Sequence, residues 1–119
     1  MNGCIVVRWG ANIPGREVKG LEVFTEAIGY FEGLAKQGRI HSHHEYITLT
    51  GRDGGFMIAD GEVDELTKIM TSMDTLALNG KAAAIVEDFE VQLYGGGNDA
   101  SIMELVGMYT TSMQGMGYM

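Results

Sequence analysis

All three histidines of the chain lie within four positions of one another, in a stretch that begins at Gly38 and alternates like a β-strand. A strand points successive side chains to opposite faces, so His41, His43 and Glu45 are predicted to share one face. Histidine and carboxylate groups spaced about 7 Å apart can ligate zinc, iron or nickel. The alternative is an exposed strand start whose histidines bond to water or a neighbour, and we predict no bound metal.

The opposite face of this strand is polar where a core strand would be apolar. A histidine can act as a general base near neutral pH, and a carboxylate can orient it. An arginine can hold a carboxylate or phenolate substrate. We therefore predict a site between the sheet and its covering elements, with catalytic His44, Tyr46, Arg8 and Glu90, and substrate-binding Trp9, Gln92 and Thr48. The alternative is that these polar residues only join two subunits.

The elements that must position these residues follow from the hydrophobic pattern. Periods of two residues mark strands and periods near 3.6 mark helices. A turn is predicted at 52–55, a second helix is predicted to start at Asp60-Gly61, and Asn79-Gly80 reads as a turn. The predicted order is strand 4–9, helix 16–37 stopped by Gly38, a strand to Thr50, strand 56–59, a helix through Met73 and strand 84–94.

This β-α-β-β-α-β order predicts an α+β, ferredoxin-like domain with a four-stranded antiparallel sheet. Both main helices cover one face of the sheet, so the other face is uncovered in a monomer. We predict one domain over 1–119, with a core at 1–97 and a helical tail at 98–119. A capping box at Ser101–Glu104 starts the tail helix. The tail is expected to be held by its own subunit or by a partner, or to act as a ligand lid.

Composition restricts the partners and the compartment. The net charge is −8, and residues 51–119 carry all of the excess with three basic and eleven acidic groups. An acidic chain without a basic stripe is a poor partner for nucleic acid or an anionic membrane. No apolar run reaches about 20 residues, and the start does not read as a signal peptide. With Cys4 as the one cysteine, we expect a cytoplasmic protein.

Two stretches, together with the element order, resemble the dimeric α/β-barrel proteins. One is Gly33–Ile40, a helix that ends in a glycine before the histidine strand, and the other is Gly51–Gly61, a hairpin leading to a helix. The resemblance covers about residues 3 to 94. The group includes antibiotic-biosynthesis monooxygenases, muconolactone-isomerase-like, chlorite-dismutase-like and YCII-related proteins. The segment Pro14–Glu17 is similar to uncharacterised bacterial members.

The resemblance implies a homodimer, a dimeric α/β barrel in which two sheets pack face to face, with a pocket between sheet and helices. It also implies a cofactor-independent oxidoreductase, isomerase or lyase that binds or transforms a small aromatic or acidic molecule. YCII-related proteins carry a histidine where this chain has Trp9–Asn12, so their acid–base pair is not carried over, and haem is not transferred. No phosphate loop, dinucleotide fingerprint or nucleophile elbow is present, and no cofactor is predicted. The alternative is a non-catalytic homodimeric binding protein.

Overall fold

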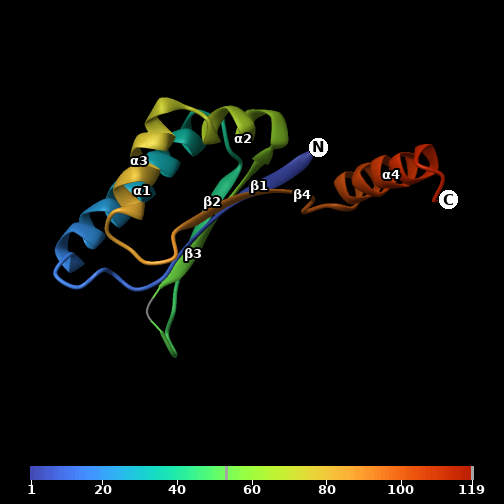
Figure 1. Cartoon of the computed structure of the whole chain (residues 1–119). Coiled ribbons are helices and arrows are strands. Elements are labelled where there is room, and N and C mark those ends of the chain that lie inside the picture. The colour runs from blue at the N-terminus through green and yellow to red at the C-terminus, as the bar shows by residue number, and fades with distance from the viewer. Residues whose placement is uncertain (53, 119) are drawn as a thin grey trace.

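A computed structural model describes residues 1–52 and 54–118 of the chain. Its strands form an antiparallel sheet in the order β2-β3-β1-β4 (Figure 1). This α+β, ferredoxin-like arrangement confirms the fold predicted from the sequence. The elements in chain order are β1 (Asn2–Trp9), α1 (Glu17–Lys36), β2 (Ser42–Ile47), β3 (Gly55–Glu62), α2 (Val63–Met70), α3 (Met73–Ala83), β4 (Glu90–Gly95) and α4 (Asp99–Gly115).

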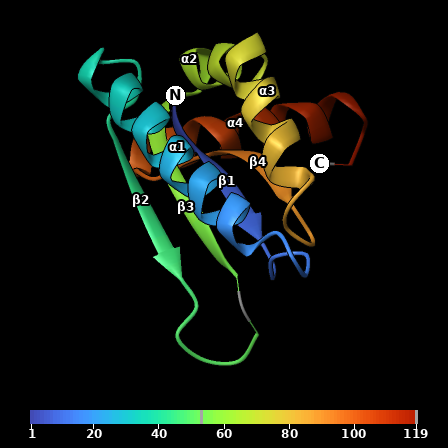
Figure 2. The ribbon, with the colours of Figure 1, turned by 90° about the vertical axis from the view of Figure 1, so that its left-hand side faces the viewer.

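The core lies between the sheet and the layer formed by α1, α2 and α3, which cover one face (Figures 1 and 2). Strand alternation sends Ile5 and Ala59 toward this layer, where they meet apolar residues of the helices. Phe31 and Leu34 are the buried residues of α1, three positions apart on one side of the helix. Burial of this apolar surface fixes which face of the sheet the helices cover.

The second crossover differs from the prediction. Asp60 and Gly61 belong to β3, where they pair with β1, instead of starting a helix. Two helices follow, and the hydroxyl of Ser72 caps the second by accepting a hydrogen bond from the Thr75 backbone N–H. The predicted turn at Asn79-Gly80 is wrong, because both residues lie inside α3. The surrounding alanine, leucine and lysine residues favour a helix, and this preference outweighs the cost of one glycine.

The predicted long strand 84–94 is also shorter in the structure, where β4 begins at Glu90. Asp88 has a φ of +53°, a left-handed conformation that interrupts an extended strand. The segment before it hydrogen-bonds to the loop that follows β1 instead. The Gly10 N–H donates to the Glu87 carbonyl at 2.7 Å, and the Ile13 N–H donates to the Ile85 carbonyl at 2.9 Å. These bonds hold in place the segment that lines one side of the pocket described below.

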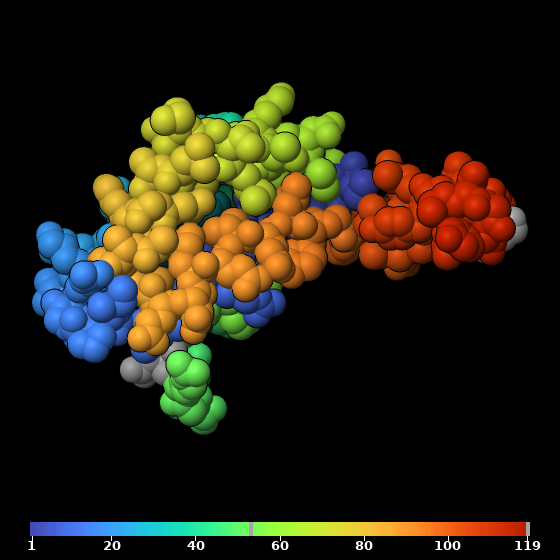
Figure 3. Space-filling view, viewed as in Figure 1, coloured from blue at the N-terminus to red at the C-terminus, as the bar shows by residue number. Residues whose placement is uncertain are grey.

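Helix α4 projects from the end of the sheet, away from the other helices (Figure 3). The Cα radius of gyration is 16.8 Å, compared with about 13.5 Å for a compact chain of this length. The helix starts at an Asn98 cap, because the Asn98 side chain accepts a hydrogen bond from the Ser101 N–H. The predicted capping box at Ser101–Glu104 is therefore wrong. The Ser101 hydroxyl instead accepts a hydrogen bond from the Asn2 N–H.

Parts of two predicted segments, the turn at 52–55 and the tail at 98–119, include residues 53 and 119, which lie outside the described residues. Within the described residues, every helix is too short or too polar to span a membrane.

Candidate functional site

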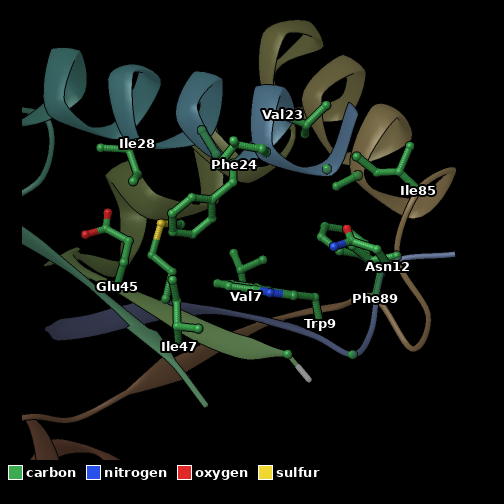
Figure 4. A pocket seen from close by; sticks show the side chains of 18 of the residues that line it. Val7, Trp9, Asn12, Val23, Phe24, Ile28, Glu45, Ile47, Ile85 and Phe89 are labelled. Carbon is green, nitrogen blue, oxygen red and sulfur yellow. The ribbon is translucent and has the colours of Figure 1, made fainter. Parts of the chain in front are cut away.

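A pocket of about 340 Å³ lies between the sheet and α1 (Figure 4). This volume is within the usual range for small-molecule sites. The ends of β1 and β2 form its floor, and the segment after α3 closes one end. Apolar side chains make up most of its lining: Val7, Trp9, Leu21, Val23, Phe24, Ala27, Ile28, Ile47, Met57, Ala82, Ile85, Val86 and Phe89.

Trp9 and Phe24 form an aromatic pair in this lining, with ring centroids 5.7 Å apart and planes tilted by 60°. Two glycines make room for the side chain and the backbone of Trp9. A Cβ on Gly55 would lie 2.9 Å from Trp9 Cζ2, and one on Gly54 would lie 2.4 Å from the Trp9 carbonyl oxygen. Gly54 also has a φ of +140°, which disfavours any other residue. The glycine pair after the hairpin turn therefore positions the tryptophan.

Glu45 is the polar residue at the end of the pocket opposite Asn12 (Figure 4). It is part of a row of three side chains. The Nδ1 atom of His43 is hydrogen-bonded to Oε1 of Glu45, and its Nε2 atom is 2.7 Å from Oε2 of Glu32 on α1. The exposed fraction is 18% for the Glu45 side chain, 10% for His43 and 53% for Glu32. The row therefore runs from the pocket to solvent and joins β2 to α1.

The two carboxylates favour the charged imidazole. Burial opposes a charge on His43, but the hydrogen bonds and charges of Glu32 and Glu45 outweigh it and raise the pKa of His43 above its usual value. The hydrogen bond from His43 lowers the pKa of Glu32, against a smaller opposing effect of desolvation. The row therefore places a carboxyl group on each side of a histidine whose pKa is raised.

Five of the predicted site residues lie on the other face of the sheet, which the described helices leave open. These are Arg8, His44, Tyr46, Glu90 and Gln92, and each is exposed. They share one face, as strand alternation predicts, whereas Trp9, which the prediction grouped with them, lines the pocket on the other face. Trp9 follows Arg8 in β1, so its side chain lies on the opposite face of the sheet and points toward α1. Alternation therefore separates the two groups by the thickness of the sheet.

Four side chains form a row across the open face of the sheet. Tyr46 stacks on Phe56 with ring centroids 4.9 Å apart, and the Arg8 guanidinium carbon lies 5.8 Å from the centroid of the Phe56 ring. Glu90 pairs with Arg8 in the β1–β4 register. This produces a row of two aromatic rings, a cation and a carboxylate across all four strands. Farther along β1, on the same face, burial and nearby Asp60 raise the pKa of the Cys4 thiol, which disfavours a reactive thiolate.

The remaining predicted residues lie at the strand ends. Thr48 lines the pocket, because β2 ends at Ile47 and the strict alternation ends with it. His41 is exposed and precedes β2, whereas His43 and Glu45 share the helix-facing side as predicted. Among the described residues, no three histidine, cysteine or acidic side chains are grouped to hold a metal ion.

Sequence reasoning missed Phe24, Glu32 and the pocket wall at 82–89. Phe24 was visible as an apolar residue of the helix, but only the fold shows that it faces a pocket. Glu32 lies beside the apolar stripe of α1, and its contact with His43 depends on how α1 crosses β2. The wall was hidden because a strand was expected there. None of these contacts has a local sequence signal.

No family model and no curated protein sequence matches the chain, whereas solved structures do. SnoaB from Streptomyces nogalater, a cofactor-independent oxygenase, matches with a TM-score of 0.62 and 16% identity, over 82% of this chain and 94% of SnoaB. A putative antibiotic biosynthesis monooxygenase from Deinococcus radiodurans matches with a TM-score of 0.61 and 8% identity, over 82% of this chain and 94% of that one. A dimeric ferredoxin-like protein of unknown function from Bacteroides fragilis matches with a TM-score of 0.59 and 13% identity, over 78% and 94%.

At these identities the similarity establishes a shared fold. The resemblance read from the sequence is confirmed at that level. The chain has the fold of dimeric ferredoxin-like proteins, among them antibiotic-biosynthesis-monooxygenase-like proteins.

Proposed function

We propose that this protein binds a small, flat, apolar organic molecule in the pocket between the sheet and α1. The observation that carries the proposal is the pocket itself: about 340 Å³, mostly apolar, with an aromatic pair and a carboxylate in its lining. Apolar walls provide binding energy, and a few polar groups fix the orientation of a ligand. Trp9 and Phe24 present ring faces and edges suited to an aromatic ligand.

The charged residues of the pocket lining indicate which ligands the pocket can bind. Glu17 and Glu45 are its charged residues in the described part of the chain. Two carboxylates repel a ligand that is already an anion, such as a carboxylic acid in its ionised form, and a partly apolar surrounding strengthens that repulsion. Of the aromatic or acidic molecules expected from the sequence, we therefore favour a neutral aromatic one. Arg8, the one arginine or lysine of the described strands, lies on the open face.

We propose that the protein is an enzyme of the cofactor-independent kind, an oxidoreductase, isomerase or lyase whose first step is removal of a proton by Glu45. A carboxylate in a half-enclosed, apolar site is a suitable general base. The similarity to SnoaB supports this class by analogy of fold. The non-catalytic alternative keeps the pocket but gives Glu45 only a binding role.

We further propose that two subunits pack their open sheet faces together. The face carries Tyr46, which is 50% exposed, and Tyr94, which is 43% exposed, beside the Arg8–Phe56 contact. A solvent-facing sheet is normally polar, whereas this one mixes aromatic and charged groups as interfaces do. In this arrangement Arg8, His44, Tyr46, Glu90 and Gln92 join subunits and leave the pockets accessible on the outer sides.

The pocket can be tested by filling it. Ala27 faces the pocket from α1, so Ala27→Phe should occupy the space and abolish binding of the neutral fluorescent probe N-phenyl-1-naphthylamine. Ala83→Phe, at an exposed position of α3, is the matched control and should bind like the native protein. Trp9 is the only tryptophan of the chain, so quenching of its emission reports occupancy directly. Equal binding by both variants would overturn the proposal.

A further inference from the structure

The Glu32–His43–Glu45 row joins the pocket to the surface through two hydrogen bonds to one imidazole ring. An ionised carboxylate only accepts hydrogen bonds, so a ring that bonds two of them carries a proton on both nitrogens. The ring is held from both sides: Glu45 lies on its own strand and Glu32 on α1. Its rotation is therefore restricted by two elements that are fixed by the core.

This geometry leaves one oxygen of Glu45 available to a ligand. Oε1 is bonded to His43, and no hydrogen-bond partner of Oε2 is found in the described part of the chain. Glu45 lines the pocket, and its side chain is only 18% exposed. A carboxylate held by one oxygen presents the other in a defined direction, which is the arrangement that efficient proton transfer requires.

We propose that Glu32 and His43 are positioning residues that hold Glu45 as the proton acceptor of the pocket, for ligands that carry an acidic hydroxyl group on an aromatic ring. The inference rests on the function proposed above. In the step concerned, the ligand O–H bond breaks and the proton goes to Oε2 of Glu45. The electron pair stays on the ligand oxygen, and the imidazolium of His43 keeps both of its protons.

The inference can be tested with 2-naphthol, whose hydroxyl becomes much more acidic on excitation and whose neutral and anionic forms emit at different wavelengths. Bound to the native protein, it should show anion emission, because Glu45 accepts the proton. In Glu45→Gln, which keeps the shape of the side chain, the ratio of anion to neutral emission should fall by at least about tenfold with binding retained. Naphthalene, which lacks the hydroxyl, should bind equally to both proteins.

Variants of Glu32 test the positioning role separately. Glu32→Ala removes the partner of His43 Nε2 and should lower the anion emission of bound 2-naphthol severalfold without changing naphthalene binding. Glu32→Gln retains an acceptor oxygen and should recover most of the signal. Glu26→Ala is the matched control, since Glu26 is a glutamate of the same helix that pairs with Lys81 and not with His43.

The outcomes separate the two proposals. If neither naphthalene nor 2-naphthol binds to the native protein, the proposed pocket function fails. If both bind, and anion emission is the same in native protein, Glu45→Gln and Glu32→Ala, the pocket stands and the positioning role is overturned. Circular dichroism of each variant shows whether it is folded, so that a loss of anion emission caused by unfolding is recognised.

Discussion

At the residue scale, the central observation is that neighbouring residues of a strand point to opposite faces of the sheet. The face on which a side chain lies decides which site it can contribute to. His43 and His44 are adjacent, yet His43 pairs with buried Ala59 on the helix side, whereas His44 pairs with Ile58 on the open face. The histidine cluster is thus divided between two surfaces. The sequence shows this alternation, and the structure shows which of the two faces has a pocket.

The space around Trp9 predicts a stability difference between two glycines. Gly55→Ala places a Cβ 2.2 Å from the Tyr46 carbonyl oxygen and 2.9 Å from the indole, so backbone and side chain must shift. We expect a loss of about 1–3 kcal/mol in the free energy of unfolding, and altered Trp9 emission. Gly29→Ala, on α1 with open space around it, should instead stabilise the protein by up to about 1 kcal/mol. Chemical denaturation of both variants measures the difference. Similar effects of the two would show that Gly55 is not packed as described.

The raised pKa of His43 and the lowered pKa of Glu32 predict a pH window of stability. A raised histidine pKa in the folded state stabilises below the unfolded pKa, and the gain is lost as pH rises through the folded value. A lowered carboxyl pKa stabilises above the unfolded value, and the gain is lost as pH falls through the folded one. The ion pair should therefore contribute fully between the unfolded-state pKa of Glu32 and that of His43, and the contribution should disappear as pH passes the folded-state value on either side.

Melting temperatures across pH check this window. His43→Ala leaves the half-buried Glu45 without its partner and should cost about 1–3 kcal/mol inside the window, with a smaller loss above it. His41→Ala, at an exposed position outside β2, is the control and should have little effect at any pH. A constant loss for His43→Ala at all pH values would show that packing, and not charge, is what the variant removes.

At the element scale, the periodic segments were predictable and the connections were not. The four strands and α1 follow from alternation and from the 3–4-residue spacing of apolar side chains. The segment 84–89 lacked a predictable form because its hydrogen bonds go to the loop after β1, a partner more than seventy residues away in sequence. The same contact closes the pocket, so the pocket could not be delimited from local pattern alone.

Helix α4 is the element least supported by its own subunit. Ile102, Val106, Tyr109 and Met113 are each 46–64% exposed, and Gly107 weakens the helix. A helix of this length with few contacts is marginal in water. Its first turn is nonetheless anchored by the Asn2–Ser101 bond, which directs it away from the sheet. Of the contacts expected from the sequence, we therefore propose one with a second subunit.

A chain that ends at Val106 tests this contact. Loss of the apolar surface beyond that residue should weaken self-association, because Tyr109 and Met113 are 64% and 46% exposed in a single subunit. Sedimentation equilibrium should give a higher dimer dissociation constant for the shortened chain, and a chain ending at Gly117 should behave like the full one. An unchanged constant together with an unchanged melting temperature would mean that α4 makes no contact between subunits.

At the scale of the whole molecule, the sheet face that the described helices leave uncovered is the surface through which the proposed dimer would form. Ile58 lies at the centre of the open face, between Val6 and His44 in register. In the proposed dimer it is buried against the partner. A charge placed there would lose its solvation without gaining a counter-ion.

Ile58→Arg should therefore raise the dimer dissociation constant by at least about a hundredfold. Leu76→Arg, an aliphatic-to-arginine change at a half-exposed position of α3, is the matched control and should leave the constant unchanged. Light scattering over a range of protein concentrations measures both. If Ile58→Arg associates as tightly as the native protein, the open face is not the interface.

The most direct test of the proposed site is a crystal structure of the protein with bound 2-naphthol. The ring should lie in the pocket between the sheet and α1, against Trp9 and Phe24, with its hydroxyl within hydrogen-bond distance of Glu45. His43 should remain bonded to both Glu45 and Glu32 in the complex. A pocket filled by its own side chains, with the probe bound on the open face near His44 and Tyr46, would contradict the site assigned to this protein.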